Sequence, residues 1–259
     1  MNYLLKYLIV TTISFIFFVQ SFNCSNSDDI SLLYPDSTTV IKFQLDWQKQ
    51  FYQNRVKEFK NSPIGKNKIV FLGNSITYGL RHWNEKFDVE NIVNRGISGD
   101  YSDGILSRLK EIVFYKPIAV YILIGINDFF DDNRSRPERT PDYVAKNILL
   151  AAKLIQKSSP QTKIYIQTIL PINNQQYLDE KPHYQFLYSN YPSINDQINK
   201  TNEIISKYND FEIIDLHSHF LNSNHEMMRS LSTDGLHLND QGYEKWINIL
   251  KPYIKSINI

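Results

Sequence analysis

Short apolar runs alternate with longer amphipathic segments over most of the chain. The runs at 68–72, 91–94, 118–124, 163–169 and 211–216 are mainly apolar and have the length of buried strands. The segments near 103–115, 141–158, 195–208 and 239–255 place apolar residues at helical spacing. Strands that alternate with helices predict right-handed crossovers and one parallel sheet covered on both faces. We therefore expect an α/β fold with about five parallel strands.

The ends of these segments carry signals of their own. Thr140 precedes Pro141 and is expected to cap the helix that begins there, and Asn239 is the expected N-cap of the last helix. The pattern also turns helical over 41–59, before the first predicted strand. The stretch 173–192 is polar, rich in Tyr and contains two prolines, so it is expected to be a long loop of the kind that often serves function.

The N-terminus has a different pattern from the rest. A run of apolar, aromatic and hydroxyl residues over 7–19 is too short to span a membrane and is typical of a secretory signal peptide. We assign 1–23 to this signal, 24–40 to a flexible tether and 41–259 to a single domain, and we expect an exported protein. Cys24, the only cysteine, is either a lipidated anchor that tethers the protein to a membrane or an ordinary residue behind a cleavage site after Ser21. The expected location is periplasmic, cell-surface or secreted.

Charge narrows the class of partner. The 28 basic and 27 acidic residues nearly cancel, and no run of five like charges occurs. A nucleic-acid-binding domain needs a basic face, so no nucleic-acid partner is expected. The 259 residues and the 42% hydrophobic content are those of an ordinary globular domain.

Four short motifs in a fixed order carry the candidate chemistry. They are Gly73–Ile76, Ser98–Asp100, Gly125–Asp128 and Asp234–His237. The first three follow the first three predicted strands, and the carboxyl ends of parallel strands meet at one edge of a sheet, where ligands bind. The fourth lies between the last strand and the last helix. We therefore expect the four motifs to form one site.

The residue types in these motifs suit nucleophilic hydrolysis of an ester. Ser75 is a nucleophile that needs a base to take its proton, and His237 is the natural base because imidazole titrates near neutral pH. Asp234, three residues before it, would hold the imidazole in the required tautomer. The backbone N–H groups of Ser75 and Gly99 and the side-chain amide of Asn127 are candidate donors to an oxyanion.

These motifs together resemble the SGNH (GDSL-type) hydrolase superfamily, named for a Ser, Gly, Asn and His in successive blocks. The matching residues are Ser75, Gly99, Asn127 and His237, with Asp234 completing the triad, and the resemblance runs from about Lys68 to the C-terminus. The stretches 69–77 and 94–100 look like a bacterial branch akin to platelet-activating-factor acetylhydrolase and carbohydrate acetylesterases. The resemblance implies a three-layer α/β/α, flavodoxin-like fold, esterase or lipase activity, and no cofactor. Asn74 replaces the acid frequent in the first block, which we expect to affect local structure more than chemistry.

The sequence constrains the identity of the substrate less than it constrains the type of reaction. The resemblance implies a small-molecule or glycan ester, and we expect hydrolysis of small acyl groups, above all acetyl, from carbohydrate. A lipid-directed esterase, such as a lysophospholipase or thioesterase, is the alternative within enzymes, and a non-catalytic carbohydrate-binding protein is the alternative of another class. Acyl-chain preference and turnover of a chromogenic ester separate these hypotheses.

Several other residues have both a functional and a structural interpretation. His217, His219 and His225 are candidate metal ligands, and 131–133 resembles a calcium loop without its spacing, so we expect no metal. His82 and Trp83 either form a pocket wall or a surface turn. The aromatic side chains of 173–192 are either a lid or sugar platform or part of an ordinary packed loop; they include Tyr184, Phe186, Tyr188 and Tyr191.

Overall fold

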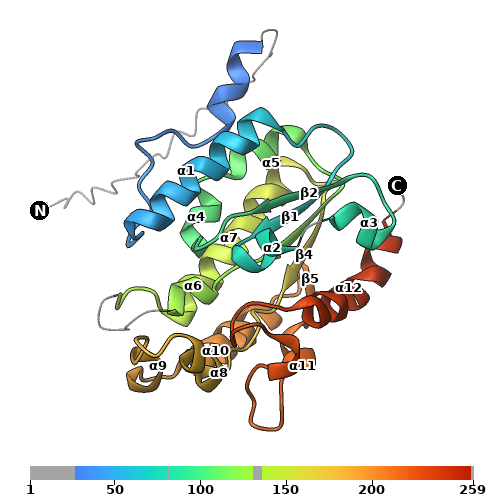
Figure 1. Cartoon of the computed structure of the whole chain (residues 1–259). Coiled ribbons are helices and arrows are strands. Elements are labelled where there is room, and N and C mark those ends of the chain that lie inside the picture. The colour runs from blue at the N-terminus through green and yellow to red at the C-terminus, as the bar shows by residue number, and fades with distance from the viewer. Residues whose placement is uncertain (1–26, 81, 131–135, 258–259) are drawn as a thin grey trace, which may run out of the picture.

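A five-stranded parallel sheet forms the centre of the protein, seen in a computed structural model that describes residues 27–80, 82–130 and 136–257 (Figure 1). The strand order is β2-β1-β3-β4-β5, and every pair is parallel. All five predicted strands are present, although the last is shorter than expected. The strands are β1 (Ile69–Gly73), β2 (Ile92–Gly96), β3 (Ala119–Leu123), β4 (Lys163–Gln167) and β5 (Glu212–Ile214).

The central strands are apolar because both of their faces are covered. Every residue of β1 and β3 is buried, as expected for the middle of a parallel sheet. Aromatic side chains pair across the sheet: the rings of Phe71 and Tyr121 stack at 4.8 Å, and those of Tyr121 and Tyr165 at 4.5 Å. Trp246 meets Phe71 edge to face at 6.4 Å from the helix above. These contacts fix the register of β1, β3 and β4.

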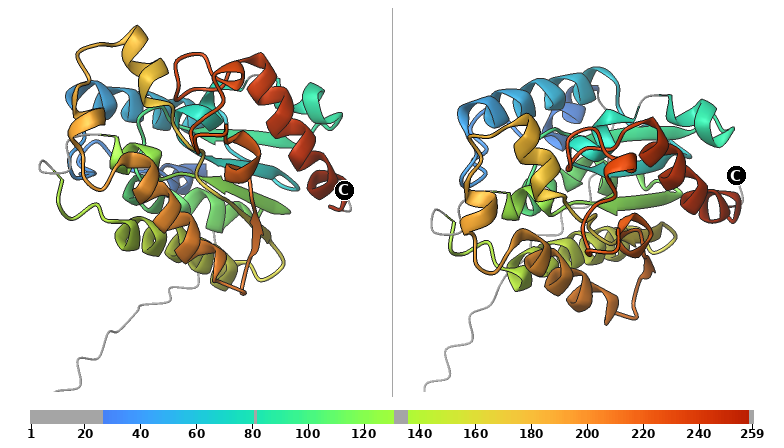
Figure 2. Two further views of the ribbon diagram at one scale, coloured as in Figure 1. Left: turned by 90° about the horizontal axis from the view of Figure 1, so that it is seen from below. Right: turned by 60° about the horizontal axis from the view of Figure 1, so that its bottom comes forward.

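Helices lie on both faces of the sheet (Figure 2). On one face α7 (Pro141–Ser158) packs with α4 (Ser102–Leu106), α5 (Leu109–Tyr115) and α10 (Ile194–Ser206). On the other, α12 (Asp240–Lys255) packs with α3 (Trp83–Phe87). The expected three-layer α/β/α architecture is confirmed. The expected caps are also present: the Thr140 hydroxyl accepts a bond from an N–H of the first turn of α7, and Asn239 does the same for α12.

One helix expected from the sequence is interrupted in the structure and forms two helices. The segment expected as a helix over 103–115 breaks between α4 and α5 at Ser107 and Arg108, where Arg108 leaves helical geometry with φ −120° and ψ 20°. The Arg108 guanidinium points back to the ends of the strands and donates to the Gly73 and Arg95 carbonyls. The break therefore directs a buried cation toward the edge of the sheet.

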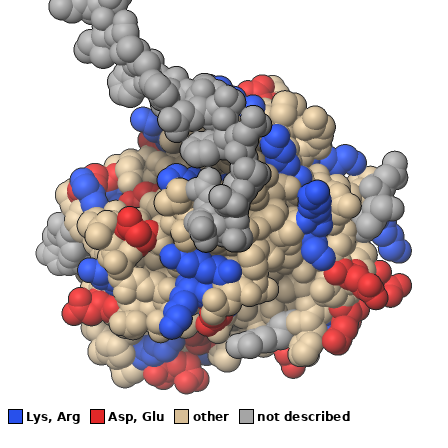
Figure 3. All heavy atoms as spheres, turned by 90° about the horizontal axis from the view of Figure 1, so that it is seen from above, with Lys and Arg blue, Asp and Glu red and all other residues tan. Residues whose placement is uncertain are grey.

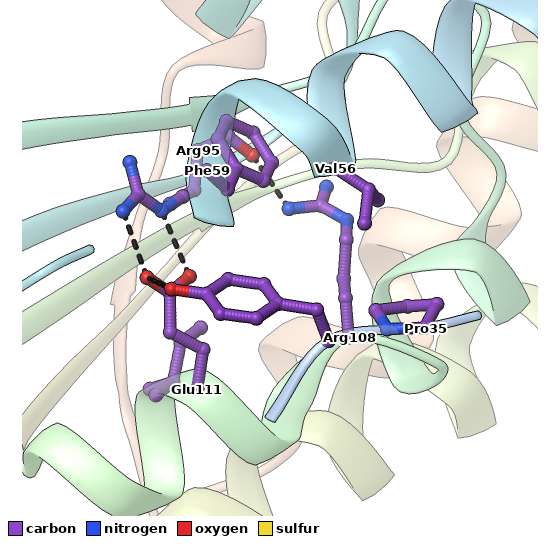
Figure 4. Close-up of a pocket in the computed structure, with 8 residues that line it drawn as sticks. Pro35, Val56, Phe59, Arg95, Arg108 and Glu111 are labelled. Atoms are coloured by element: carbon purple, nitrogen blue, oxygen red, sulfur yellow. Dashed lines mark hydrogen bonds and ion pairs between the residues drawn. The ribbon is translucent and has the colours of Figure 1, made fainter. Parts of the chain in front are cut away.

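The segment 24–40, expected to be a flexible tether, contains regular structure from Ser27 onward. It forms the 3₁₀ helix η1 (Ser27–Leu33) and then leads to α1 (Asp46–Asn61), which begins later than the helical pattern did. The buried hydroxyl of Tyr34 donates to Glu111 at 2.9 Å, and the Arg95 guanidinium binds the same carboxylate through two nitrogens (Figure 4). A buried carboxylate needs such partners, and Tyr34 supplies one.

The signal-peptide prediction for 1–23 and Cys24 lie outside the described residues, and export stays a prediction. No helix within the described ranges is long and apolar enough to cross a membrane. On the face shown in Figure 3, acidic and basic side chains both occur and neither sign dominates the view.

The stretch 173–192, expected to be a long loop, contains two helices. They are α8 (Asn174–Glu180) and α9 (Phe186–Ser189). The side chain of Asn173 caps α8 by accepting from the Gln176 N–H at 2.9 Å, and Tyr177 and Leu178 are buried beneath it. The polar composition of the stretch hid this helix, because only two of its seven residues face the core. The remaining short elements are α2 (Ser75–Gly79), α6 (Ile126–Phe129), α11 (His217–Phe220) and η2 (Arg229–Leu231).

Candidate active site

Ser75 stands at a sharp strand-to-helix turn. It is the first residue of α2, two residues beyond the end of β1, and it is partly exposed. The buried side chain of Asn74 accepts a hydrogen bond from the Ile76 N–H at 3.0 Å and so caps the helix. Asn74 therefore has a structural role, as expected for the residue that replaces an acid. The Ser75 N–H has no helical acceptor because the helix begins there.

His237 and Asp234 reach Ser75 from the other end of the chain. The His237 Nε2 lies 3.2 Å from the Ser75 Oγ, and the His237 Nδ1 lies 2.9 Å from the Asp234 Oδ2. The carboxylate accepts the Nδ1 proton, which leaves Nε2 as the acceptor that faces the serine hydroxyl. The structure thus brings the three side chains predicted as a triad into one hydrogen-bonded chain.

The Asp234 carboxylate is held in its ionised form. Burial acts to raise its pKa, but hydrogen bonds and charge from His237, together with a hydrogen bond from Lys181, keep that pKa well below its usual range. Its Oδ1 accepts the backbone N–H groups of Leu236 at 3.0 Å and His237 at 2.8 Å. A fixed carboxylate in turn fixes the orientation of the imidazole.

Gly99 occupies a tight turn after β2. The Asp100 N–H donates to the Ile97 carbonyl at 3.2 Å, and Gly99 has φ +75°, the left-handed conformation that a type II turn requires at its third position. A Cβ at Gly99 would lie 2.7 Å from the Trp47 ring and 2.9 Å from the Gln48 Cγ. Glycine is needed here both for the backbone conformation and for the close approach of α1.

Asn127 lies in α6, directly after β3. One proton of its side-chain amide is used in a hydrogen bond to the Asp100 carbonyl at 2.9 Å. The amide has a second donor proton, and the side chain is only partly buried. The bond to Asp100 ties Asn127 to the Gly99 turn, so the two predicted oxyanion donors share one hydrogen-bonded unit.

Two buried ion pairs hold these loops from the side of the core. Asp100 accepts two bonds from Arg108, at 2.8 and 3.1 Å. Asp128, the residue after Asn127, pairs with Arg139 and accepts from the N–H and hydroxyl of Ser102, each at 2.9 Å. Burial raises the pKa of Asp100 and of Asp128 to about 6 in spite of their arginine partners.

The first helix contributes side chains that the sequence motifs did not reveal. The buried amide of Gln48 donates to the Gly99 carbonyl at 3.1 Å and accepts from the Tyr101 hydroxyl at 2.9 Å. Trp47, next to it, is 55% exposed and borders the Gly99 turn. The helical spacing of 41–59 predicted a helix but carried no signal for a place at the site.

Other residues singled out in the sequence lie away from Ser75 or in the core. Trp83 is buried and meets Trp246 at 5.3 Å, whereas His82 is exposed and pairs with Glu85. The aromatic residues of 173–192 divide into two sets. Tyr184 and Phe186 are packed against the core, whereas Tyr188 and Tyr191 are exposed by 59% and 92%.

The histidines considered as metal ligands have other surroundings. The His217 Nδ1–H donates to the Ile169 carbonyl at 2.8 Å, and burial lowers the pKa of His217. Within the part of the chain that the structure describes, no three His, Cys, Asp or Glu side chains gather in a group that could hold a metal ion. The calcium-like stretch 131–133 lies outside the described residues.

Comparison with known proteins identifies this arrangement. The model of the GDSL-like lipase/acylhydrolase family matches residues 71–245. Platelet-activating factor acetylhydrolase IB subunit alpha2 of Rattus norvegicus is 27% identical over 193 residues, which are 71% of this chain and 73% of the relative. A GDSL-like lipase from Bacteroides thetaiotaomicron has a similar fold, with a TM-score of 0.63, 22% identity, and coverage of 79% of this chain and 97% of that one.

An acetyl xylan esterase also shares the fold, with a TM-score of 0.54 and 22% identity, over 72% of this chain and 99% of that one. The family model covers well over half of the sequence and includes all four motifs. The chain belongs to the GDSL-like lipase/acylhydrolase family, and it is an ester hydrolase.

Proposed function

We propose that the protein is a serine esterase that removes small acyl groups, above all acetyl, from carbohydrate, with Ser75, His237 and Asp234 as its triad. The observation that carries the catalytic part is the hydrogen-bonded chain from the Ser75 Oγ through His237 to Asp234. A serine hydroxyl is a weak nucleophile alone, and an imidazole held by a carboxylate is the base that activates it.

The reaction follows from this geometry in two halves. His237 Nε2 takes the hydroxyl proton while the Ser75 Oγ bonds to the ester carbonyl carbon. The oxyanion that forms accepts hydrogen bonds from the Ser75 and Gly99 N–H groups and the second Asn127 amide proton. The carbon–oxygen bond to the alcohol then breaks, the alcohol leaves with the proton from His237, and water repeats the sequence to release the acid and restore Ser75.

The preference for a short acyl group is supported by Trp47. Its ring borders the Gly99 turn, whose N–H is one of the proposed donors to the oxyanion. We infer that a bulky side chain next to this turn limits the length of the acyl chain that the site accepts. Removing the ring is expected to open that side of the site.

The acetyl preference also has support in the names of similar proteins. The rat relative is named an acetylhydrolase of platelet-activating factor, and a protein with the same fold is named an acetyl xylan esterase. The acetyl group is common to both names. The first favours a second candidate, a lipid-directed esterase that removes acetyl from a lipid, and the second favours a carbohydrate.

A Ser75→Ala variant tests the catalytic proposal. Turnover of p-nitrophenyl acetate is expected to fall by at least about 10⁴-fold, because the attacking oxygen is gone. Ser223→Ala is the matched control, because Ser223 is exposed and belongs to none of the four motifs. Full activity in Ser75→Ala, or no activity in the wild-type protein, would end the proposal.

A substrate panel tests the acyl and alcohol parts. The wild-type protein is expected to favour acetyl over octanoyl esters by about 100-fold or more in kcat/KM, and Trp47→Ala is expected to narrow that ratio. Acetylated xylan and platelet-activating factor are then compared at equal acetyl concentration. Faster release from xylan supports the carbohydrate proposal, and faster release from the lipid favours the alternative.

A further inference from the structure

The Asp234 carboxylate has a cationic partner that none of the four motifs contains. The Lys181 Nζ donates to the Asp234 Oδ2 at 3.0 Å, the same oxygen that accepts from His237. Lys181 follows α8 directly, and its side chain is 36% exposed while that of Asp234 is 13% exposed. Its ammonium also lies 4.3 Å from the centre of the Tyr177 ring. The lysine is thus held on two sides.

The helix that ends directly before Lys181, α8, is packed on the loop that carries Asp234. The Asn173 N–H donates to the Gly235 carbonyl at 2.8 Å, and the Gln176 amide donates to the Ser232 carbonyl at 3.1 Å. A Cβ at Gly235 would lie 2.4 Å from the Asn173 carbonyl oxygen. These contacts fix α8 relative to the loop, and therefore the ion pair does not depend on a freely moving side chain alone.

We propose that Lys181 is a positioning residue for the catalytic pair: it holds the Asp234 carboxylate in place and adds a fixed positive charge close to the imidazole. This inference rests on the proposed function of the triad. Two donors on the Oδ2 and two backbone N–H groups on the Oδ1 leave the carboxylate one orientation. The positive charge of Lys181 opposes a second positive charge on the imidazole.

Few charged or titratable groups face the Asp234–His237 pair. Within the described residues, the Asp234 carboxylate faces His237 of its own loop and, on α8, Lys181 and the Tyr177 hydroxyl. The imidazole faces Ser75 on α2. Lys181 is therefore the one permanent cation in this set. Removing it takes away a positive charge that opposes protonation of the imidazole, so a variant without Lys181 is expected to need a higher pH for full activity.

Lys181→Met removes the charge while keeping much of the side-chain volume. The acid limb of the profile of kcat/KM against pH is expected to move up by roughly half a unit to one unit, since the lysine is partly screened by solvent. In Lys181→Arg the charge remains, and the limb is expected to stay within about 0.2 units of wild type.

Arg229→Met is the matched control. Arg229 pairs with Asp179 at 2.6 Å, so this bridge also joins α8 to the segment before the Asp234 loop, but it does not touch the carboxylate. The control is expected to leave the acid limb unchanged. An equal loss of activity at every pH in Lys181→Met, with no movement of the limb, would show a structural role only and overturn the inference.

A titration without turnover separates this inference from the proposed function. In a Ser75→Ala background, the His237 imidazole resonance is followed by NMR against pH with and without Lys181→Met. The midpoint is expected to rise when the lysine is removed. A midpoint that does not move overturns the inference even if the esterase proposal holds. A midpoint that moves in a protein without esterase activity refutes only the proposed function.

Discussion

The two sides of the candidate site are built in different ways. Ser75, Gly99 and Asn127 each follow a strand of the sheet, and buried ion pairs of Asp100 and Asp128 lie directly beneath them. Asp234 and His237 lie in a loop between η2 and α12, and their carboxylate is held by backbone N–H groups and by Lys181. We call these the nucleophile side and the acid–base side after the roles proposed above: the first is fixed by the core and the second by a neighbouring segment.

This difference indicates which side of the site can accommodate sequence variation. The ends of parallel strands are set by sheet register, so the nucleophile side changes only if the sheet does. The acid–base loop depends on α8, part of a stretch that the family motifs do not include. Aromatic contacts of 4.8 Å from Phe130 to Tyr177 and 5.7 Å from Phe130 to Phe186 link this stretch to the end of α6. The stretch 173–192 therefore touches both sides of the site.

The largest expected effect comes from Asp234→Asn on the acid–base side. The variant is expected to lose about 10⁴-fold in kcat, because an amide no longer selects the tautomer that leaves Nε2 free to accept a proton. Asp240→Asn is the control, since Asp240 is exposed at the start of α12. Steady-state kinetics on an acetyl ester measure both, and a loss below tenfold in Asp234→Asn would contradict the role of the carboxylate.

The two sides are also expected to respond to pH with opposite sign. The pKa of Asp100 is raised to about 6, so the folded protein binds more protons than the unfolded chain between about pH 4 and 6. This contribution to stability is present below the unfolded pKa and is lost as pH rises through about 6. The pKa of Asp234 is lowered, so its contribution is present above the unfolded value and is lost on acidification below it.

Urea unfolding at a series of pH values measures this contrast. In Asp100→Asn, the decrease in unfolding free energy between pH 4 and 6 is expected to be smaller than in wild type. In Asp234→Asn, that decrease remains and the loss below about pH 4 becomes smaller. Identical pH dependence in the two variants would remove the electrostatic part of the comparison.

A smaller effect on activity is expected from substituting either of two glycines that have the same φ angle. Gly99 and Gly65 both have φ +75°, but a Cβ meets Trp47 at Gly99 and nothing within 4 Å at Gly65. Gly65→Ala is expected to cost about 1 kcal/mol of stability and leave kcat unchanged. Gly99→Ala is expected to lower kcat by about 100-fold as well, because the turn must move away from α1. Equal kcat in both variants would show that the position of the Gly99 turn does not matter.

The places of Ser75, Gly99 and Asn127 relative to the sheet could be predicted from the sequence. Apolar runs marked the strands, and a residue directly after a strand has its place set by the sheet, so Ser75, Gly99 and Asn127 were located by counting. His237 and Asp234 were found through their spacing and the family resemblance. The sequence did not predict that Gln48 and Lys181 belong to the site. Each acts through contacts with residues more than 50 positions away, and a glutamine or lysine in or next to a mainly polar helix carries no local pattern that distinguishes it.

The contact between Tyr34 and Glu111 has a consequence for the order of folding. The two residues are 77 positions apart, and Gln48 and the Gly99 turn are 51 apart. Such distant pairs form slowly because a long loop must close before either partner gains a contact. In a chain that emerges from its N-terminus, residues 34–48 leave the ribosome before their partners exist. The contacts of residues 34–48 with the turn after β2 and with α5 can therefore form only once those later segments have been synthesised.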